Sequence, residues 1–286
     1  VEAYNISATT RTVDTLPLWT ASSKLDAVGL NWTDRRILSH SDTAGINFNW
    51  ASLSSEQQTA LRGSDTATVG GQRVDYLRGD RSREAPAGSF RQRASRMGTV
   101  VNSNLWTVAA PKRLKFEHAG HTSFRSTHIN RSETVYIGAN GGMLHAFDGA
   151  TGTERFAYVP RAAYAGLREY TLPQYTHRPF VDGHPFTGDV DTSWVANQIT
   201  TPVWRTVLIS GLGGGGRGFF VVDVTDPTNV SNTSVWLDRT FPANSSGTFV
   251  GHQDVGHIYG APVTDNLSGG RSEQIVKLNN KRWAVV

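Results

Sequence analysis

The sequence predicts a mainly β protein, and more specifically a β-propeller of four-stranded antiparallel blades, of which this chain forms a partial ring. Three observations support this fold class. Short runs rich in β-branched and aromatic residues follow one another from about residue 97 onward. Turn residues separate most of these runs, in a chain with 29 glycines. The runs also recur in a similar order, which indicates a repeat architecture.

The predicted strands are short and are bounded by residues that favour turns. Asn140-Gly141-Gly142 separates the first two strands, and asparagine and glycine accept the positive φ angles of a tight hairpin. Thr151-Gly152 separates the second strand from the third, with Asp148 shaping the same turn. The predicted strands cover residues 135–139, 143–149, 153–159, 204–210, 218–225, 273–278 and 282–286.

An internal repeat relates these strands to one another. Units begin near residues 102, 180 and 259, and each contains several short predicted strands. Blade repeats usually measure ~40–50 residues, so the wider spacing here predicts long insertions between strands. Alignment of the units pairs Gly138 with Gly211, Asp148 with Asp223, Phe156 with Trp236, and Pro185 with Pro262, the last two being 77 residues apart (262 − 185).

The first third of the chain differs from the rest. Residues 1–97 are expected to form an irregular, partly helical lead-in module, and residues 98–286 to form the blades. The last predicted strand ends without a turn, so the remaining blades are expected beyond Val286 in a longer parent protein.

Three helices are predicted. The first covers Leu53–Leu61, where serines followed three residues later by glutamines form a capping box and Gly63 ends the helix. A second, short helix is predicted over residues 74–77, and a third over residues 161–170.

Composition excludes several classes of protein. No apolar run approaches ~20 residues, so no segment is expected to span a membrane. Cysteine is absent, which removes disulfides and thiolate metal sites. The net charge is +4, and no nucleic-acid-binding motif accompanies it. An arginine-rich stretch could contact phosphates, but it is expected instead to be a solvated loop that forms salt bridges within its own domain: Arg73, Arg78, Arg81, Arg83, Arg91, Arg93 and Arg96.

Two short motifs have functional and structural interpretations. Residues 211–216 match G-x-G-x-x-G, but a strand pattern follows where a dinucleotide site needs a helix, so a hairpin turn is the better interpretation. Arg78-Gly79-Asp80 is the tripeptide that integrins bind. The alternative is that Arg78 and Asp80 cap a short helix or form local ion pairs.

Metal-ligating residue types occur in loops without the spacing of a known site. Asp189 and Asp191 could share a cation, and two groups containing histidine could bind a transition metal. Neither a serine nucleophile elbow nor a paired-carboxylate pattern stands out. The two groups are His118, His121 and His128, and His252, Asp254 and His257.

Several segments together resemble one protein family. The two longest are TVYIGANGGMLHAFDGATGTERFAYVPRA (134–162) and WRTVLISGLGGGGRGFFVVDVTDP (204–227). They and three shorter segments resemble the C-terminal propeller of the PilY/PilC-type pilus-biogenesis and tip-adhesin proteins of type IV pili. The shorter segments are YLRGDRSRE (76–84), GTVVNSNLW (98–106) and HRPFVDGHP (177–185).

The resemblance implies a non-enzymatic scaffold of pilus assembly, twitching motility and adhesion. Such a protein would lie in the cell envelope or outside a Gram-negative cell, and would bind minor pilins at the pilus tip, or host or abiotic surfaces. The family also implies calcium, held by an Asp-rich loop that does not occur in this sequence and would be expected after Val286. The blade motif also resembles quinoprotein dehydrogenases, which leaves a quinone-dependent enzyme as the alternative.

Overall fold

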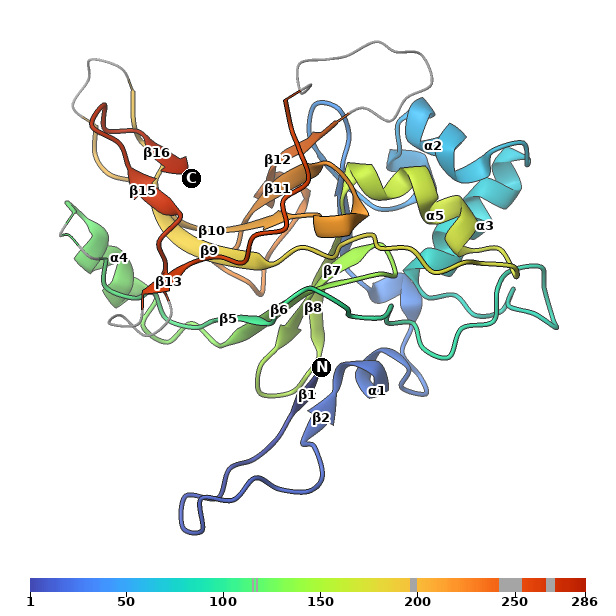
Figure 1. Cartoon of the computed structure of the whole chain (residues 1–286), viewed down its shortest axis with the longest axis horizontal. Coiled ribbons are helices and arrows are strands. Elements are labelled where there is room, and N and C mark those ends of the chain that lie inside the picture. Colours follow the sequence, from blue (N-terminus) through green and yellow to red (C-terminus); the bar gives the residue numbers. More distant parts are fainter. Residues whose placement is uncertain (115, 117, 196–199, 242–253, 266–270) are drawn as a thin grey trace.

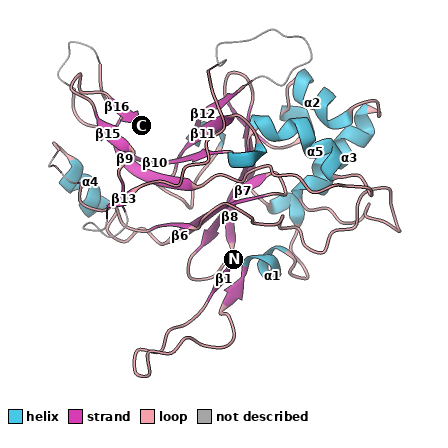
Figure 2. Ribbon diagram, in the orientation of Figure 1, coloured by secondary structure: helices cyan, strands magenta, loops and turns pink. Residues whose placement is uncertain are grey.

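The computed structural model describes residues 1–114, 116, 118–195, 200–241, 254–265 and 271–286. Strands make up most of the body, while α2, α3 and α5 gather at one end (Figures 1 and 2). The helices are α1 (Ala21–Leu25), α2 (Ser55–Arg62), α3 (Ala67–Arg78), α4 (His121–Thr127) and α5 (Tyr164–Tyr170). The predicted mainly β fold is confirmed, and none of the helices in the described residues is long and apolar enough to cross a membrane.

The strands form two larger sheets and three small hairpins. One sheet has the order β4-β3-β8-β7-β6-β5, and the other has the order β12-β11-β10-β9. The strands of the six-stranded sheet are β3 (Ile37–His40), β4 (Gly45–Asn47), β5 (Trp106–Val108), β6 (Thr134–Ala139), β7 (Met143–Asp148) and β8 (Glu154–Val159). Those of the second are β9 (Pro185–Asp191), β10 (Trp204–Gly211), β11 (Gly218–Asp223) and β12 (Val235–Thr240).

Each sheet contains one of the predicted four-stranded blades. Strands β5 to β8 run antiparallel in sequence order, and β9 to β12 repeat this arrangement. The predicted Asn-Gly-Gly hairpin joins β6 to β7, with Gly142 at φ +95°. The turn between β7 and β8 places Gly152 at φ +71°, where a Cβ would lie 2.4 Å from the Trp19 ring. This position needs glycine for both its backbone angle and its lack of a side chain.

The registers of the two blades confirm most of the sequence alignment. Gly138 pairs with Leu144, four residues before Asp148, and Gly211 pairs with Phe219, four residues before Asp223. The two aspartates also cap equivalent turns. Asp148 Oδ1 accepts from the backbone N–H of Thr151 at 2.8 Å, and Asp223 Oδ1 accepts from that of Thr225 at 2.9 Å. These positions therefore correspond between the blades.

The predicted match of Phe156 with Trp236 is wrong by one residue. Phe156 pairs with Ala146, and the equivalent partner in the second blade is Leu237. Both blades contain a register shift at this point, which leaves one residue unpaired on the outer strand. In the second blade the unpaired residue is Trp236. Its side chain is 40% exposed, whereas that of Phe156 is fully buried.

Consecutive units pack on each other in the same way. A Cβ on Gly138 would lie 2.3 Å from the carbonyl oxygen of Val181, and one on Gly211 would lie 2.6 Å from Cβ of Ile258. Val181 and Ile258 are 77 residues apart (258 − 181), the spacing that also separates Pro185 from Pro262. The entry to each new unit therefore crosses the preceding blade at a glycine.

The third unit consists of two short hairpins. Strand β13 (Thr264–Asp265) pairs with β14 (Arg271–Ser272), and β15 (Ile275–Lys277) pairs with β16 (Trp283–Val285). Among the described residues these two pairs are separate sheets, so the third unit does not form a four-stranded blade like the first two. Ile275 packs toward Gly188 of the second blade, where a Cβ would lie 2.5 Å from its Cδ1 atom.

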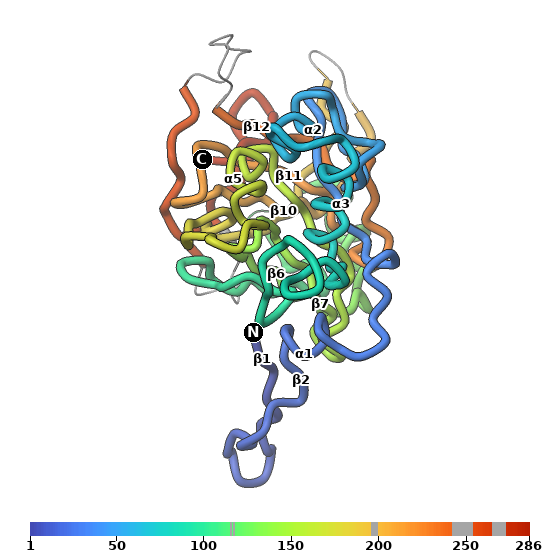
Figure 3. Tube along the Cα trace, turned by 90° about the vertical axis from the view of Figure 1, so that its right-hand side faces the viewer, coloured from blue at the N-terminus to red at the C-terminus, as the bar shows by residue number. Residues whose placement is uncertain are grey.

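The lead-in segment joins the first blade. Strand β3 pairs in parallel with β8, and residues from α2 and α3 share one hydrophobic core with both blades. The boundary between residues 97 and 98 stays a prediction, but the sheet and the core extend across it. By contrast, the first part of the lead-in segment, the hairpin of β1 (Glu2–Ala3) and β2 (Trp19–Thr20), projects away from the body (Figure 3).

Two helices of the lead-in show how local sequence and packing combine. The capping box before α2 is confirmed: Ser54 Oγ accepts from the N–H of Gln57, and the Gln57 side chain accepts from the N–H of Ser54. The predicted short helix over residues 74–77 is in fact the longer α3. Gly70 lies inside α3 because its missing side chain admits the Trp50 ring, which a Cβ would approach to 2.4 Å.

A buried carboxylate links the two blades. Asp238 on β12 accepts from the Tyr158 hydroxyl on β8 at 2.6 Å, and from the Arg161 backbone N–H at 2.9 Å. Burial raises the pKa of Asp238, and these donors act against that effect. The Tyr158 ring also lies 4.7 Å from that of Phe220 on β11. The blades are therefore joined by a hydrogen-bonded contact inside the apolar core.

Most of the arginine cluster has partners within its own domain, as the sequence predicts, but several of these side chains are buried and do not lie in a solvated loop. Arg93 is buried, forms an ion pair with Glu84 at 2.8 Å and lies 3.6 Å above the Tyr76 ring. Arg73 is equally buried and donates to the Leu61 carbonyl at 2.9 Å. An irregular segment leaves backbone carbonyl groups without strand or helix partners, and here guanidinium groups donate hydrogen bonds to them.

Arg35 of the lead-in segment makes a second deeply buried ion pair. Its guanidinium donates through two nitrogens to Glu154 on β8, at 2.7 and 2.9 Å. His145 on β7 bonds the same carboxylate at 2.7 Å. The pKa of Glu154 falls from 4.5 to about 2, because the attraction of Arg35 and the hydrogen bonds outweigh the opposing effect of burial. The lead-in is thereby fixed to the blade.

We expect Gly138→Ala to destabilise the fold by about 1–3 kcal/mol, because the new methyl group collides with the backbone of Val181. Gly260→Ala is the matched control, since a Cβ there would meet nothing within 4 Å. Urea unfolding followed by tryptophan fluorescence measures both free energies. Equal stability of the two variants would contradict the proposed blade contact.

We expect Glu154→Gln to cost about 3–5 kcal/mol at neutral pH, because it leaves Arg35 buried without its counter-charge. Since the folded pKa of Glu154 lies below 4.5, its contribution is complete above that pH and disappears as pH falls toward 2. The stability gap between wild type and variant should therefore shrink over this window. Denaturation curves from pH 7 to pH 3 measure it, with exposed Glu56→Gln as control. A gap independent of pH would contradict this account.

Candidate functional site

A long insertion in the first blade forms one wall of the candidate site. Residues 109–133 connect β5 to β6 and include α4. Two contacts fasten this insertion to the second blade: His121 Nε2 lies 2.9 Å from Asp189 Oδ2, and Arg131 donates to the Thr206 hydroxyl at 2.8 Å. Arg131 also donates to the Ala109 carbonyl at 2.6 Å, which closes the insertion on itself. The insertion is therefore anchored at several points.

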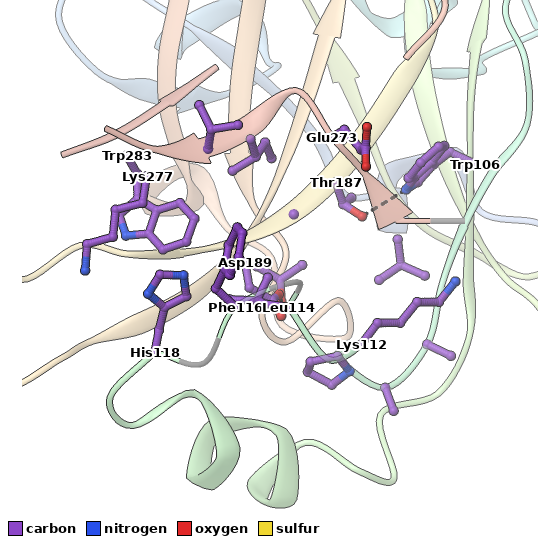
Figure 4. Close-up of a pocket in the computed structure, with 18 of the residues that line it drawn as sticks. Trp106, Lys112, Leu114, Phe116, His118, Thr187, Asp189, Glu273, Lys277 and Trp283 are labelled. Atoms are coloured by element: carbon purple, nitrogen blue, oxygen red, sulfur yellow. Dashed lines mark hydrogen bonds between the residues drawn. The ribbon is translucent and has the colours of Figure 1, made fainter. Parts of the chain in front are cut away.

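A cavity of about 620 Å³ lies beside this insertion (Figure 4). Its other walls are β5 and β9, the first strands of the two blades, and the β15–β16 hairpin. Trp106, Val108 and Ile275 give it apolar walls. The indole N–H of Trp106 donates to the Thr187 hydroxyl at 2.9 Å, which fixes the ring at the cavity edge. Phe116 also lines the cavity and is 70% exposed. This volume is in the usual range for a ligand pocket.

Charged and aromatic side chains lie around these walls. Lys112, Glu273 and Lys277 line the cavity, and the Lys277 ammonium lies 6.0 Å from the centre of the Trp283 ring. His118 packs edge-on against Trp283 at 5.3 Å. Burial, together with the nearby charge of Lys277, lowers the pKa of His118, so this ring is neutral at pH 7. The cavity thus combines apolar walls with charges of both signs.

The two aspartates predicted to share a cation have other partners. Asp189 is buried; one oxygen faces His121 and the other accepts from the Thr206 hydroxyl at 2.6 Å. Burial raises the pKa of Asp191, but the Ser193 hydroxyl and the backbone N–H groups of Ser193 and Val203 donate to this carboxylate and lower its pKa overall. The structure thus places Asp189 in the anchor of the insertion and Asp191 at the end of β9, where it caps the following turn.

The histidine candidates are dispersed. His121 belongs to the anchor, His118 to the aromatic wall, and His128 packs against Phe124 at 4.7 Å. His257 bonds the Gly213 carbonyl at 2.8 Å, while His252 lies outside the described residues. Within the described part of the chain, no three His, Asp or Glu side chains are grouped to bind a metal. Calcium therefore stays a prediction from family resemblance.

The integrin-type tripeptide is built into the end of α3. The Arg78 guanidinium donates to the carbonyls of Phe48, Thr33 and Arg35, at 2.8, 3.1 and 3.1 Å. Gly79 ends the helix at φ +127°, and Asp80 accepts from both the backbone and the hydroxyl of Ser82. These contacts agree with a structural role at the end of the helix. They also engage the Arg78 guanidinium and the Asp80 carboxylate, the two groups that a receptor would have to bind.

Asp182 and Asn102, which the sequence does not single out, join the second blade to Asn140 of the predicted hairpin. Asp182 is buried and accepts from the side-chain amides of Asn102 and Asn140, at 2.6 and 3.3 Å. Asn140 in turn accepts from the Phe180 backbone N–H at 2.9 Å. Its neighbour Gly141 lies against Gly98, with no room for side chains between them. The blade motif residues therefore act as structural residues.

The glycine-rich run after β10 forms a turn. Residues 211–216 lead directly into β11, and Gly213 adopts φ +55° close to the backbone of Asp182. Because a strand follows, the run lacks the helix N-terminus that binds a pyrophosphate. The hairpin interpretation is confirmed.

We expect Arg78→Ala to cost about 2–3 kcal/mol, because three backbone carbonyls lose a charged donor. Arg78→Lys should recover only part of this, since one ammonium cannot match the guanidinium fork. Thermal unfolding measures both variants, with exposed Arg83→Ala as the control that changes stability by less than about 0.5 kcal/mol. Unchanged stability of Arg78→Ala, with loss of cell binding, would instead support the receptor interpretation.

Comparison with known proteins identifies the family. The profile of the PilY1 β-propeller domain matches residues 97–286. The type IV pilus biogenesis factor PilY1 of Pseudomonas aeruginosa strain PAK is 33% identical over 99% of this chain, and the chain spans 23% of that relative. A PilY1 homologue of Xylella fastidiosa strain Temecula1 is 38% identical over 80% of this chain and 17% of its own length.

A solved structure is also similar to this chain. The crystal structure of the Pseudomonas aeruginosa PilY1 C-terminal domain is 29% identical, with a TM-score of 0.42, over 63% of this chain and 30% of that one. The family profile and the curated relatives, which match along most of the chain, confirm the resemblance in five separate motifs. This chain belongs to the PilY1 β-propeller domain family.

Proposed function

We propose that this chain is a non-enzymatic scaffold of type IV pilus biogenesis, and that it binds a pilin-like polypeptide at the cavity between the insertion and the β15–β16 hairpin. Membership of the PilY1 family supports the role in pilus biogenesis. The whole relatives are more than four times longer, so their other parts would add further functions. The protein would act in the cell envelope or at the pilus tip, where adhesion to surfaces would also occur.

The anchored insertion is the observation that supports the binding site. Loops on a rigid scaffold commonly carry binding residues. Here a long loop is fastened by the buried His121–Asp189 contact, yet it leaves Phe116 largely exposed beside the cavity. An exposed aromatic ring and the fixed Trp106, both in the lining of this cavity, suit the apolar anchor residue of a partner polypeptide.

The charges at this site also suit a polypeptide. Lys112, Lys277 and Glu273 offer both signs of charge around apolar walls, whereas a nucleic acid would favour positive charge alone. A pilin-like surface would place an apolar side chain in the cavity and polar groups against these residues. Minor pilins are the partners that we propose.

Phe116→Ala should weaken binding of a purified minor pilin from the same bacterium by roughly tenfold or more, because a hot-spot aromatic contributes over about 1.4 kcal/mol. The matched control is Ile129→Ala, which removes an apolar side chain of similar exposure (59%) from the same insertion, outside the cavity lining. Isothermal titration calorimetry measures both. Unchanged affinity in both variants, or failure of every minor pilin to bind, would overturn the proposal.

The quinoprotein alternative makes a different prediction. It requires reduction of a redox dye when quinone and calcium are added to the protein together with an alcohol or sugar. The scaffold proposal expects no such reduction, and observed turnover would replace it.

A further inference from the structure

A second cavity, of about 490 Å³, lies on a different part of the chain. Most of its lining comes from residues between positions 91 and 100, and the rest consists of Val1, Ser22, Asn140, Tyr170, Tyr175 and His177. Its described lining includes two arginines and a histidine but neither aspartate nor glutamate. A cavity with this composition favours an anionic ligand, because no lining carboxylate offsets the positive charge.

The two arginines of this cavity differ in their partners. Arg93 is neutralised by Glu84 and uses its remaining donors on the carbonyls of Tyr76 and Asp80. Arg91 forms no ion pair among the described residues. Its Nε donates to the Tyr170 carbonyl at 3.1 Å, which leaves its two terminal nitrogens without a carboxylate partner. One cationic group is therefore available at this site.

Arg91 is held in a fixed orientation by two aromatic rings. Its guanidinium carbon lies 4.4 Å from the centre of the Tyr170 ring and 4.7 Å from that of Tyr175. These two rings contact each other edge to face at 5.2 Å. A guanidinium that lies over aromatic rings can still donate hydrogen bonds from its N–H groups, which point outward in its plane. Because the rings already restrict the side chain, little further conformational entropy is lost when a ligand binds. The group is thus preorganised to bind an anion.

We infer that this cavity binds a single carboxylate of a peptide, with Arg91 as its main donor. One unpaired guanidinium matches one negative charge, and its two terminal nitrogens match the two oxygens of a carboxylate. The volume exceeds what a small inorganic ion needs, and the tyrosine rings give the rest of the peptide an apolar surface. His177, whose Nε2 lies 2.9 Å from the Thr99 hydroxyl, offers a further polar contact at the same wall.

Four probes test the ligand class on the wild-type chain by calorimetry. They are an acetylated tripeptide with a free C-terminal carboxylate, the same tripeptide amidated, a tripeptide with blocked ends and a central glutamate, and inorganic phosphate. Saturable binding of either carboxylate peptide, without binding of the amidated one, supports the inference and shows whether a chain end or a side chain is preferred. Equal or tighter binding of phosphate, or no binding up to about 10 mM, overturns it.

Two variants test the role of Arg91. Arg91→Gln should weaken the carboxylate peptide by roughly tenfold or more, and Arg91→Lys should recover only part of this loss. Arg83→Gln, in the same arginine-rich segment but exposed, should bind as the wild type does. Because a variant of Arg91 could fold poorly, a second experiment uses the wild-type chain and measures how fast phenylglyoxal modifies Arg91 with and without the peptide. The peptide should slow modification of Arg91 by phenylglyoxal, and unchanged modification would overturn the inference.

Discussion

The buried ion pair between Arg35 and Glu154 is the contact on which the rest of the structure depends. It joins an irregular segment to the outer strand of the first blade, and His145 bonds the same carboxylate from the next strand. Arg35 also donates to the Arg78 carbonyl at 2.6 Å, at the end of α3. Removal of one partner would leave an uncompensated charge among apolar residues, so the three segments are constrained together.

The same chemistry extends through the lead-in segment. Long irregular segments leave carbonyl groups without strand or helix partners, and buried arginines satisfy them here. Arg73 and Arg93 do this while packing their planar groups on aromatic rings. Contacts inside the molecule therefore account for much of the positive charge of the sequence. Arg91 has no carboxylate partner among the described residues, and this difference suggests a ligand.

Local patterns in the sequence predict much of the fold. The Asn-Gly-Gly hairpin, the capping box at Ser54 and the correspondence of Gly138 with Gly211 each depend on neighbouring residues or on a repeat, and each is present. The alignment of Phe156 with Trp236 fails because a bulge shifts the register by one residue. The full length of α3 is missed because Gly70 lowers local helix propensity, while its packing against Trp50 is a tertiary effect.

The candidate sites are harder to predict because their residues come from distant segments. The first cavity combines residues near positions 106–118, 187–189 and 273–283, which only the folded chain brings together. Asp189 is singled out by its residue type, yet its partner His121 lies 68 residues away and gives it a structural role. Arg91 lies in a predicted cluster, but nothing local distinguishes it from its neighbours.

The close approach at Gly138 and Gly211 has a consequence for how this family can diversify. At Gly138 the main chain of the next unit contacts the blade directly, and at Gly211 the Ile258 side chain does so, and the angle between neighbouring units therefore depends on the missing side chain of each glycine. Substitutions elsewhere on the surface then leave that angle unchanged. An insertion such as residues 109–133 leaves these glycine contacts untouched, so its length and chemistry can change while the packing of neighbouring units is kept.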